Sequence, residues 1–222
     1  KLGFVSKEDG IECEQGFFLT HGWDKKIPPR AIENLGTDFL FPEIKYKFHA
    51  CCHGLHSFLE ALDEMKLENN FNPETIEEIA IETNPSWLKV CNIEEPKTGL
   101  ESKFSYKLTA AMSIYGKDTS NLDTYSDEIC FDDKLNNIRD KVRVIPNDNL
   151  SNTQSLISIK DGSSNVKNKH DLSDKIENNI LETKIVNKSV SLLSETKSNQ
   201  ISKILNAPNE NKVDALVDCL VS

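Results

Sequence analysis

The stretch KFHACCHGLHSFLEALDEMKL, residues 47–67, joins the densest group of reactive side chains in the chain to its clearest helical pattern. The apolar residues that recur at helical spacing in it are Leu55, Phe58, Leu59, Leu62 and Met65. This spacing predicts an amphipathic helix whose apolar stripe packs on a core. The preceding residues, KYKFHACC at 45–52, predict a strand that leads into the helix.

The rest of the chain alternates strand and helix patterns before it becomes helical only. The predicted strands are residues 75–83, 141–146 and a hairpin over 155–169 that turns at Asp161–Gly162. The predicted helices are residues 99–116, which stop at Gly116, residues 132–140, and three tail segments at 172–193, 198–206 and 212–221. This order predicts an α+β fold followed by a helical tail whose apolar stripes need another surface.

This order of elements divides the chain into three parts. Residues 1–44 are irregular and are interpreted as the end of one unit and a connection, residues 45–168 as the α+β unit, and residues 169–222 as the tail. Lys1 opens directly in sequence typical of a domain interior, which predicts that the chain is numbered from within a longer protein.

Composition narrows the functional classes. The net charge of −10 disfavours sequence-independent binding to nucleic acid and adsorption on anionic membranes. No apolar run reaches the roughly 18 residues that a membrane-spanning helix needs. Six cysteines without a CxxC pair predict reduced thiols and a cytoplasmic protein.

The histidine and cysteine cluster leaves several kinds of site open. A structural zinc site would need two spaced ligand pairs, and the chain offers only one run, so no metal is expected. Cys51 and Cys52 precede a helix, which could activate a thiol, but small apolar fillers are the simpler interpretation. At 100° per residue, His53 and His56 point away from the apolar stripe, as do Glu60 and Glu64, so each histidine is solvated or directed into a cleft. His49 is interpreted as structural.

At these residues the sequence resembles the MmgE/PrpD family, which includes 2-methylcitrate dehydratases, cis-aconitate decarboxylases and an iminodisuccinate epimerase. KFHACCHGLHSFLEAL is similar to the family's Lys-x-x-x-Cys-Cys-x-x-x-His-x-x-x-x-Ala-Leu segment. Further stretches agree in order: TIEEIAIET, ESKFSYKLTAAMSIYG, KVRVIPND, SLISIKDG, DLSDKIENNILETK and VDALVDCL. The resemblance implies a lid domain, with flanking helices that belong to an all-helical large domain upstream.

The resemblance also implies site residues. Lys47 corresponds to the family's active-site lysine and His56 to the histidine after the cysteine pair, which makes both candidate catalytic residues. Lys47, His53 and Lys103 are the candidate substrate-binding residues, and His53 stands where many members have arginine. Leu108 stands where some decarboxylases have tyrosine, which disfavours decarboxylation. No metal or organic cofactor is implied.

The leading hypothesis is therefore a cofactor-independent dehydratase that removes a proton α to a carboxylate of a small di- or tricarboxylate. An epimerase or decarboxylase of the same family, or a truncated interaction module without catalysis, are the alternatives. The expected partners are the substrate, the N-terminal helical domain and a second copy in a homodimer.

Overall fold

The protein is described by a computed structural model that covers residues 10, 11, 13, 16–20, 34, 36–39, 45–162, 164–208 and 212–221. The chain divides into two units, Lys1–Lys45 and Tyr46–Ser222. The first unit contains α1 (Phe17–Thr20). The proline-bearing segment at 27–32, predicted to lie in the connection, is outside the described residues.

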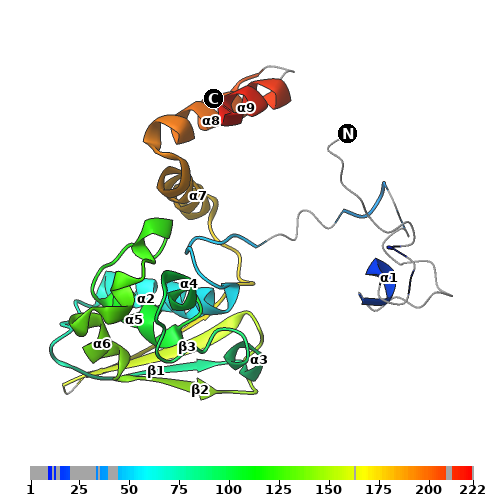
Figure 1. Cartoon of the computed structure of the whole chain (residues 1–222). Coiled ribbons are helices and arrows are strands. Elements are labelled where there is room, and N and C mark those ends of the chain that lie inside the picture. The colour runs from blue at the N-terminus through cyan, green and yellow to red at the C-terminus, as the bar shows by residue number, and fades with distance from the viewer. Residues whose placement is uncertain are drawn as a thin grey trace. The chain divides into compact units, whose positions relative to one another are not determined.

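The second unit is an α+β fold, as predicted (Figure 1). Its strands are β1 (Ile76–Thr83), β2 (Val142–Pro146), β3 (Gln154–Asp161) and β4 (Ser164–Asp171). Its helices are α2 (His56–Glu68), α3 (Pro85–Leu88), α4 (Gly99–Ser102), α5 (Tyr106–Ile114), α6 (Asp133–Arg139), α7 (Asn178–Leu193), α8 (Glu195–Asn206) and α9 (Lys212–Val221). The 3-10 turns in the described part of this unit are η3 (His53–Leu55), η4 (Leu122–Thr124) and η5 (Glu128–Phe131).

The sheet has the strand order β2-β1-β3-β4. β1 pairs in parallel with β2 and antiparallel with β3, and β3 forms the predicted hairpin with β4. Gly162 has a φ of +59° in the hairpin turn, a conformation that glycine adopts without strain. The sheet is therefore mixed, and the parallel pair needs the long connection that carries α3 to α6.

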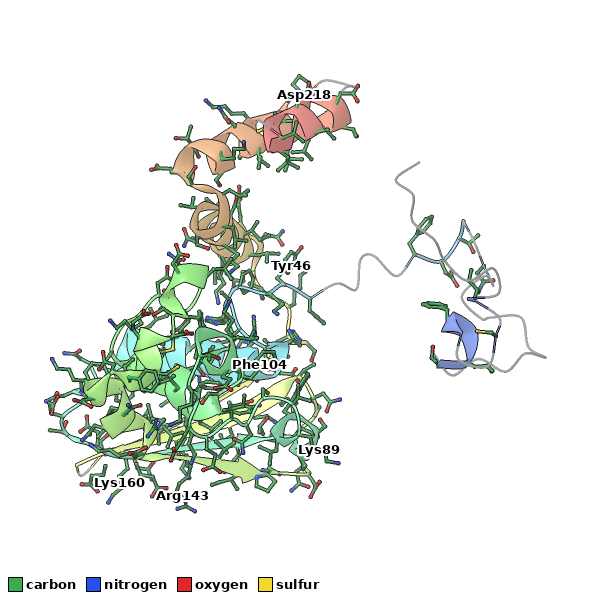
Figure 2. The ribbon with its side chains drawn as sticks, in the orientation of Figure 1. Tyr46, Lys89, Phe104, Arg143, Lys160 and Asp218 are labelled. Carbon is green, nitrogen blue, oxygen red and sulfur yellow. The ribbon has the colours of Figure 1, made fainter. Side chains whose placement is uncertain are left out.

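Helices cover one face of this sheet (Figure 1). The other face carries charged side chains, among them Glu78, Arg143 and Lys160. Phe58 of α2 and Tyr106 of α5 pack with their ring centroids 5.3 Å apart, and both are fully buried. Burying one such side chain contributes about 2 kcal/mol. Figure 2 shows Arg143 and Lys160 on the sheet side away from the helices, and both form ion pairs with glutamates of β1.

Two predicted elements differ from the structure. Residues 45–52 are not a strand, because the backbone N–H groups of Ala50 and Cys52 bond to separate distant segments instead of a ladder. The single helix predicted over 99–116 is two helices, because the Ser105 hydroxyl accepts a hydrogen bond from the N–H of Leu108 at 3.2 Å and starts α5 anew. The predicted stop holds, since Gly116 has a φ of +69°.

The helical tail follows the sheet directly. The α+β part extends to Asp171, and α7 begins at Asn178. Several apolar side chains of the tail are exposed, namely Ile180, Ile185, Val186, Leu192, Leu193, Leu205, Val213, Val217, Leu220 and Val221. None of the described helices is long and apolar enough to span a membrane.

Candidate functional site

The segment 47–52 is held by two backbone hydrogen bonds to distant parts of the chain. The N–H of Ala50 donates to the carbonyl of Thr119 at 2.8 Å, and the N–H of Cys52 donates to the carbonyl of Lys103 at 2.9 Å. The second bond fixes Lys103 beside the segment that carries Lys47. This bond places the backbone of Lys103 next to Cys52, five residues after Lys47.

An open cavity of about 500 Å³ lies over this segment. Its lining residues are Lys47, His49, Ala50, Cys51, Cys52, Leu100, Lys103, Phe104, Leu122, Lys188 and Leu192. Phe104, labelled in Figure 2, lies in the helical layer. The cavity has the size of a small-molecule site. Its described lining contains three lysines and no aspartate or glutamate, in a chain whose net charge is −10.

The three lysines come from three separate segments of the second unit. Lys47 is exposed, while Lys103 and Lys188 are partly buried. The Lys103 ammonium lies 5.7 Å from the centroid of the Tyr125 ring, and the Lys188 ammonium donates to the carbonyl of Ser120 at 2.6 Å. Burial lowers the pKa of Lys188; Asp118 opposes this effect, and the charges of Lys47 and Lys103 add to it. Three lysines from three segments thus line one cavity.

Behind the cavity wall lies a buried polar network that begins at His49. The Nδ1 atom of His49 lies 2.8 Å from the hydroxyl of Thr119, and its Nε2 lies 3.2 Å from Oε1 of Glu60. The other oxygen of Glu60 accepts from the ammonium of Lys184 in α7. Burial alone would raise the pKa of Glu60, but the contact with His49 and the charge of Lys184 outweigh it and lower this pKa to about 2. Glu60 lies on the side of α2 away from its apolar stripe, and it is buried because His49 and Lys184 cover that side.

His56 is buried beneath the same segment, with 1% of its surface exposed. Its Nδ1 lies 3.1 Å from the carbonyl of Cys52, and its ring centroid lies 5.2 Å from that of His49. Burial and then the charge of His49 lower the pKa of His56 to about 3, so the ring is neutral near pH 7. Solvation is therefore excluded for His56, and it is not among the described residues that line the cavity.

His53 lies at the start of η3, with its ring centroid 6.3 Å from that of Trp87. Burial and then the charge of Lys47 lower its pKa. His53 is likewise not among the described lining residues, so it lies near Lys47 but beside the cavity. The next residue, Gly54, leaves no room for a side chain, because a Cβ there would lie 2.6 Å from the Trp87 ring.

In the cysteine pair, Cys51 is a buried side chain that fills space in the core. Cys51 is 3% exposed, and burial raises the pKa of its thiol to about 12 even though a hydrogen bond with Tyr125 opposes the shift. A thiolate nucleophile needs the opposite shift. Among the described residues, no three His, Cys, Asp or Glu side chains converge to hold a metal ion.

Leu108 and Tyr106 both belong to the core. Leu108 is fully buried. The Tyr106 hydroxyl donates to the carbonyl of Gly54 at 2.8 Å and lies 3.1 Å from the hydroxyl of Thr83. Neither is among the described lining residues, so Tyr106 does not line the cavity in place of the tyrosine that some decarboxylases have at the position of Leu108.

Sequence reasoning missed Lys188 and the burial of Glu60. Lys184 and Lys188 stand four positions apart in α7, and this spacing on one helical face was the available signal. It could not indicate what that face contacts.

Two comparisons with known proteins bear on the chain. The family model described as MmgE/PrpD C-terminal domain matches residues 49–207. A search of the curated proteins finds no match. The matched range contains His49, His53, His56, Lys103 and Lys188.

Proposed function

The chain belongs to the MmgE/PrpD family, and on that premise we propose that it is the lid part of a lyase that acts on a small di- or tricarboxylate. The reaction we propose is a dehydration in which a proton α to a carboxylate is removed, the C–O bond of the hydroxyl on the adjacent carbon breaks, a C=C bond forms, and the hydroxyl takes up a proton and leaves as water. This chemistry requires no metal or organic cofactor if fixed cations of the protein stabilise the developing charge.

The observation that carries the proposal is the lysine-lined cavity. Lys47 and Lys103 line it together, and its described lining contains no carboxylate that would neutralise them. Ammonium groups hold carboxylates through charge and through three N–H donors each. A small polycarboxylate matches both the charge and the size of this cavity.

In the proposed mechanism, Lys47 binds the carboxylate next to the reacting carbon. The negative charge that develops on that carboxylate as the proton leaves is then stabilised by the Lys47 ammonium. Lys103 holds a second carboxylate and so orients the substrate. His56 has a positioning role, because its Nδ1 meets the Cys52 carbonyl in the segment that carries Lys47.

The general base comes from a separate helical domain in this proposal. His49 is the histidine among the described lining residues, and both of its ring nitrogens already face partners, at Thr119 and Glu60. The cavity also has an apolar rim, since Leu100 is 69% exposed and Leu122 and Leu192 are about half exposed. Such a rim favours closure by another protein surface. The exposed apolar residues of α7 to α9 support the same partner.

We propose dehydration rather than decarboxylation on the resemblance alone, in which Leu108 corresponds to a tyrosine of some decarboxylases, because Leu108 itself is a core residue. An epimerase remains the second candidate, because it begins with the same proton abstraction and would use Lys47 in the same way.

The test is turnover in deuterated water by the protein expressed from its full reading frame. 2-Methylcitrate, cis-aconitate and iminodisuccinate are followed by NMR for product and for deuterium at the carbon α to a carboxylate. Lys47→Met should lower the rate about 100-fold or more, as loss of a charge-stabilising group does. Lys45→Met removes the same charge from a nearby exposed lysine and should leave the rate unchanged. Equal rates in the two variants, or no reaction with any of the three compounds, would contradict the proposal.

A further inference from the structure

Lys188 brings a third ammonium group to the cavity from the helical tail. It lies in α7, far along the chain from Lys47 and Lys103, yet it lines the same cavity. Its hydrogen bond to the carbonyl of Ser120 at 2.6 Å fixes the ammonium in place. An ammonium has three donors, so two remain for a ligand.

The charges around Lys188 are unbalanced. Lys47 and Lys103 both act on it as like charges, and Asp118 is the carboxylate that acts on it in the opposite sense. Asp118 is not among the described residues that line the cavity. Three ammonium groups held near one another repel, and a bound anion relieves that repulsion. The more negative the ligand, the larger this relief.

We propose that Lys188 is a third substrate-binding cation and that it makes the site prefer tricarboxylates over dicarboxylates. This inference rests on the proposed function, because it assumes that Lys47 and Lys103 hold two carboxylates of the substrate. Lys188 then meets a third carboxylate, since the three lysines come from three segments that surround one cavity.

A purely structural role for Lys188 makes a different prediction. If the ammonium only holds α7 to the Ser120 carbonyl, removing the ammonium weakens the binding of every ligand equally, because one wall of the cavity becomes looser. If it contacts a third carboxylate, its loss weakens only ligands that carry one. The ratio of the two affinities therefore separates the roles.

The experiment compares propane-1,2,3-tricarboxylate with glutarate, which has the same carbon chain and lacks the central carboxylate. Their dissociation constants are measured by calorimetry on the protein expressed from its full reading frame. The variant is Lys188→Gln, whose amide can still donate to the Ser120 carbonyl while the charge is lost. Lys203→Met, which removes a charge from an exposed lysine of α8, is the control. Thermal unfolding checks that α7 remains packed.

We expect the wild-type protein to bind the tricarboxylate about tenfold more tightly than glutarate, a difference of about 1.4 kcal/mol. Lys188→Gln should weaken the tricarboxylate about tenfold and glutarate less than twofold, and Lys203→Met should change neither. Equal weakening of both ligands, or weakening of neither, would overturn the role of Lys188 while the proposed function stands. If the wild-type protein binds neither ligand, the proposed function itself falls. If Lys188→Gln unfolds, Lys188→Arg is measured in its place. Lys188→Arg keeps the charge and should keep the tenfold preference for the tricarboxylate. Loss of this preference in Lys188→Arg would overturn the inference.

Discussion

The Nε2 atom of His49 and the Oε1 atom of Glu60 lie 3.2 Å apart, and both side chains are buried. The two residues join the cavity wall to α2, and Lys184 joins α7 to the same carboxylate. One buried carboxylate thus links the helix under the site to the helix that brings Lys188. Glu60 is therefore expected to matter for stability rather than for contact with substrate.

The first prediction concerns Glu60→Gln, which should lower the free energy of unfolding by about 2 kcal/mol at pH 7. Breaking a buried ion pair costs about 3–5 kcal/mol, and we reduce the figure because Lys184 is partly solvated. The folded-state pKa of Glu60, about 2, lies below its unfolded value, so the stabilisation is present above the unfolded value. It is lost as the pH falls toward 2.

Urea unfolding of both proteins at pH 7 and at pH 3 measures this difference. The gap between wild type and Glu60→Gln should be smaller at pH 3. A gap of the same size at both values would show that the ionised form of Glu60 does not carry the stabilisation.

His56 is predicted to remain neutral in the folded protein from pH 8 down to pH 5, because its pKa is lowered to about 3. The unfolded chain takes up a proton at this histidine near pH 6.5, so folding stability falls as the pH drops from about 6.5 toward 3. Nitrogen-15 NMR of the imidazole titrates the folded protein directly. His56→Gln should show a shallower loss of stability over that range, and a titration near pH 6.5 in the folded protein would refute the assignment.

Cys51 is predicted to be unreactive and dispensable for chemistry, because burial raises its pKa to about 12. At pH 8, iodoacetamide should label the less buried Cys219 well before Cys51, which mass spectrometry of the digested protein resolves. Cys51→Ala should keep turnover within a few-fold. Early labelling of Cys51 together with loss of turnover in Cys51→Ala would instead support a thiol nucleophile.

Gly54→Ala should destabilise the protein by about 1–3 kcal/mol, as overpacking does. A Cβ at this position would lie 2.6 Å from the Trp87 ring and 2.8 Å from the sulfur of Cys91. Trp87→Leu in the same chain should recover part of the loss, and thermal unfolding of the single and double variants measures the coupling. Additive effects of the two substitutions would contradict the close approach.

Local patterns predicted much of the fold. α2, β1 and the β3–β4 hairpin follow from apolar spacing and from the turn residues at Asp161–Gly162. The strand predicted over 45–52 failed because the partners of its backbone groups, Thr119 and Lys103, lie far along the chain. No periodicity within the segment contains that information.

The candidate site was only partly predictable from the sequence, because several of its contacts join segments that lie far apart along the chain. Lys47 and Lys103 were chosen from a resemblance, and they line one cavity. His56 was chosen in the same way, but its burial depends on how 47–52 folds over α2, which helical geometry alone does not give. Lys188 depends on the packing of α7 on Ser120, a long-range contact.

The central claim is that a small polycarboxylate binds between Lys47 and Lys103. The most direct test is NMR of the protein with ¹³C-dimethylated lysines, which keep their charge, during titration with propane-1,2,3-tricarboxylate. Lys47→Met and Lys103→Met assign the two signals by their loss, and Lys160 on the polar sheet face is the internal control. We predict that the signals of Lys47 and Lys103 shift and saturate together while that of Lys160 stays. Shifts of similar size at all three lysines, or none at Lys47 and Lys103, would contradict the claim.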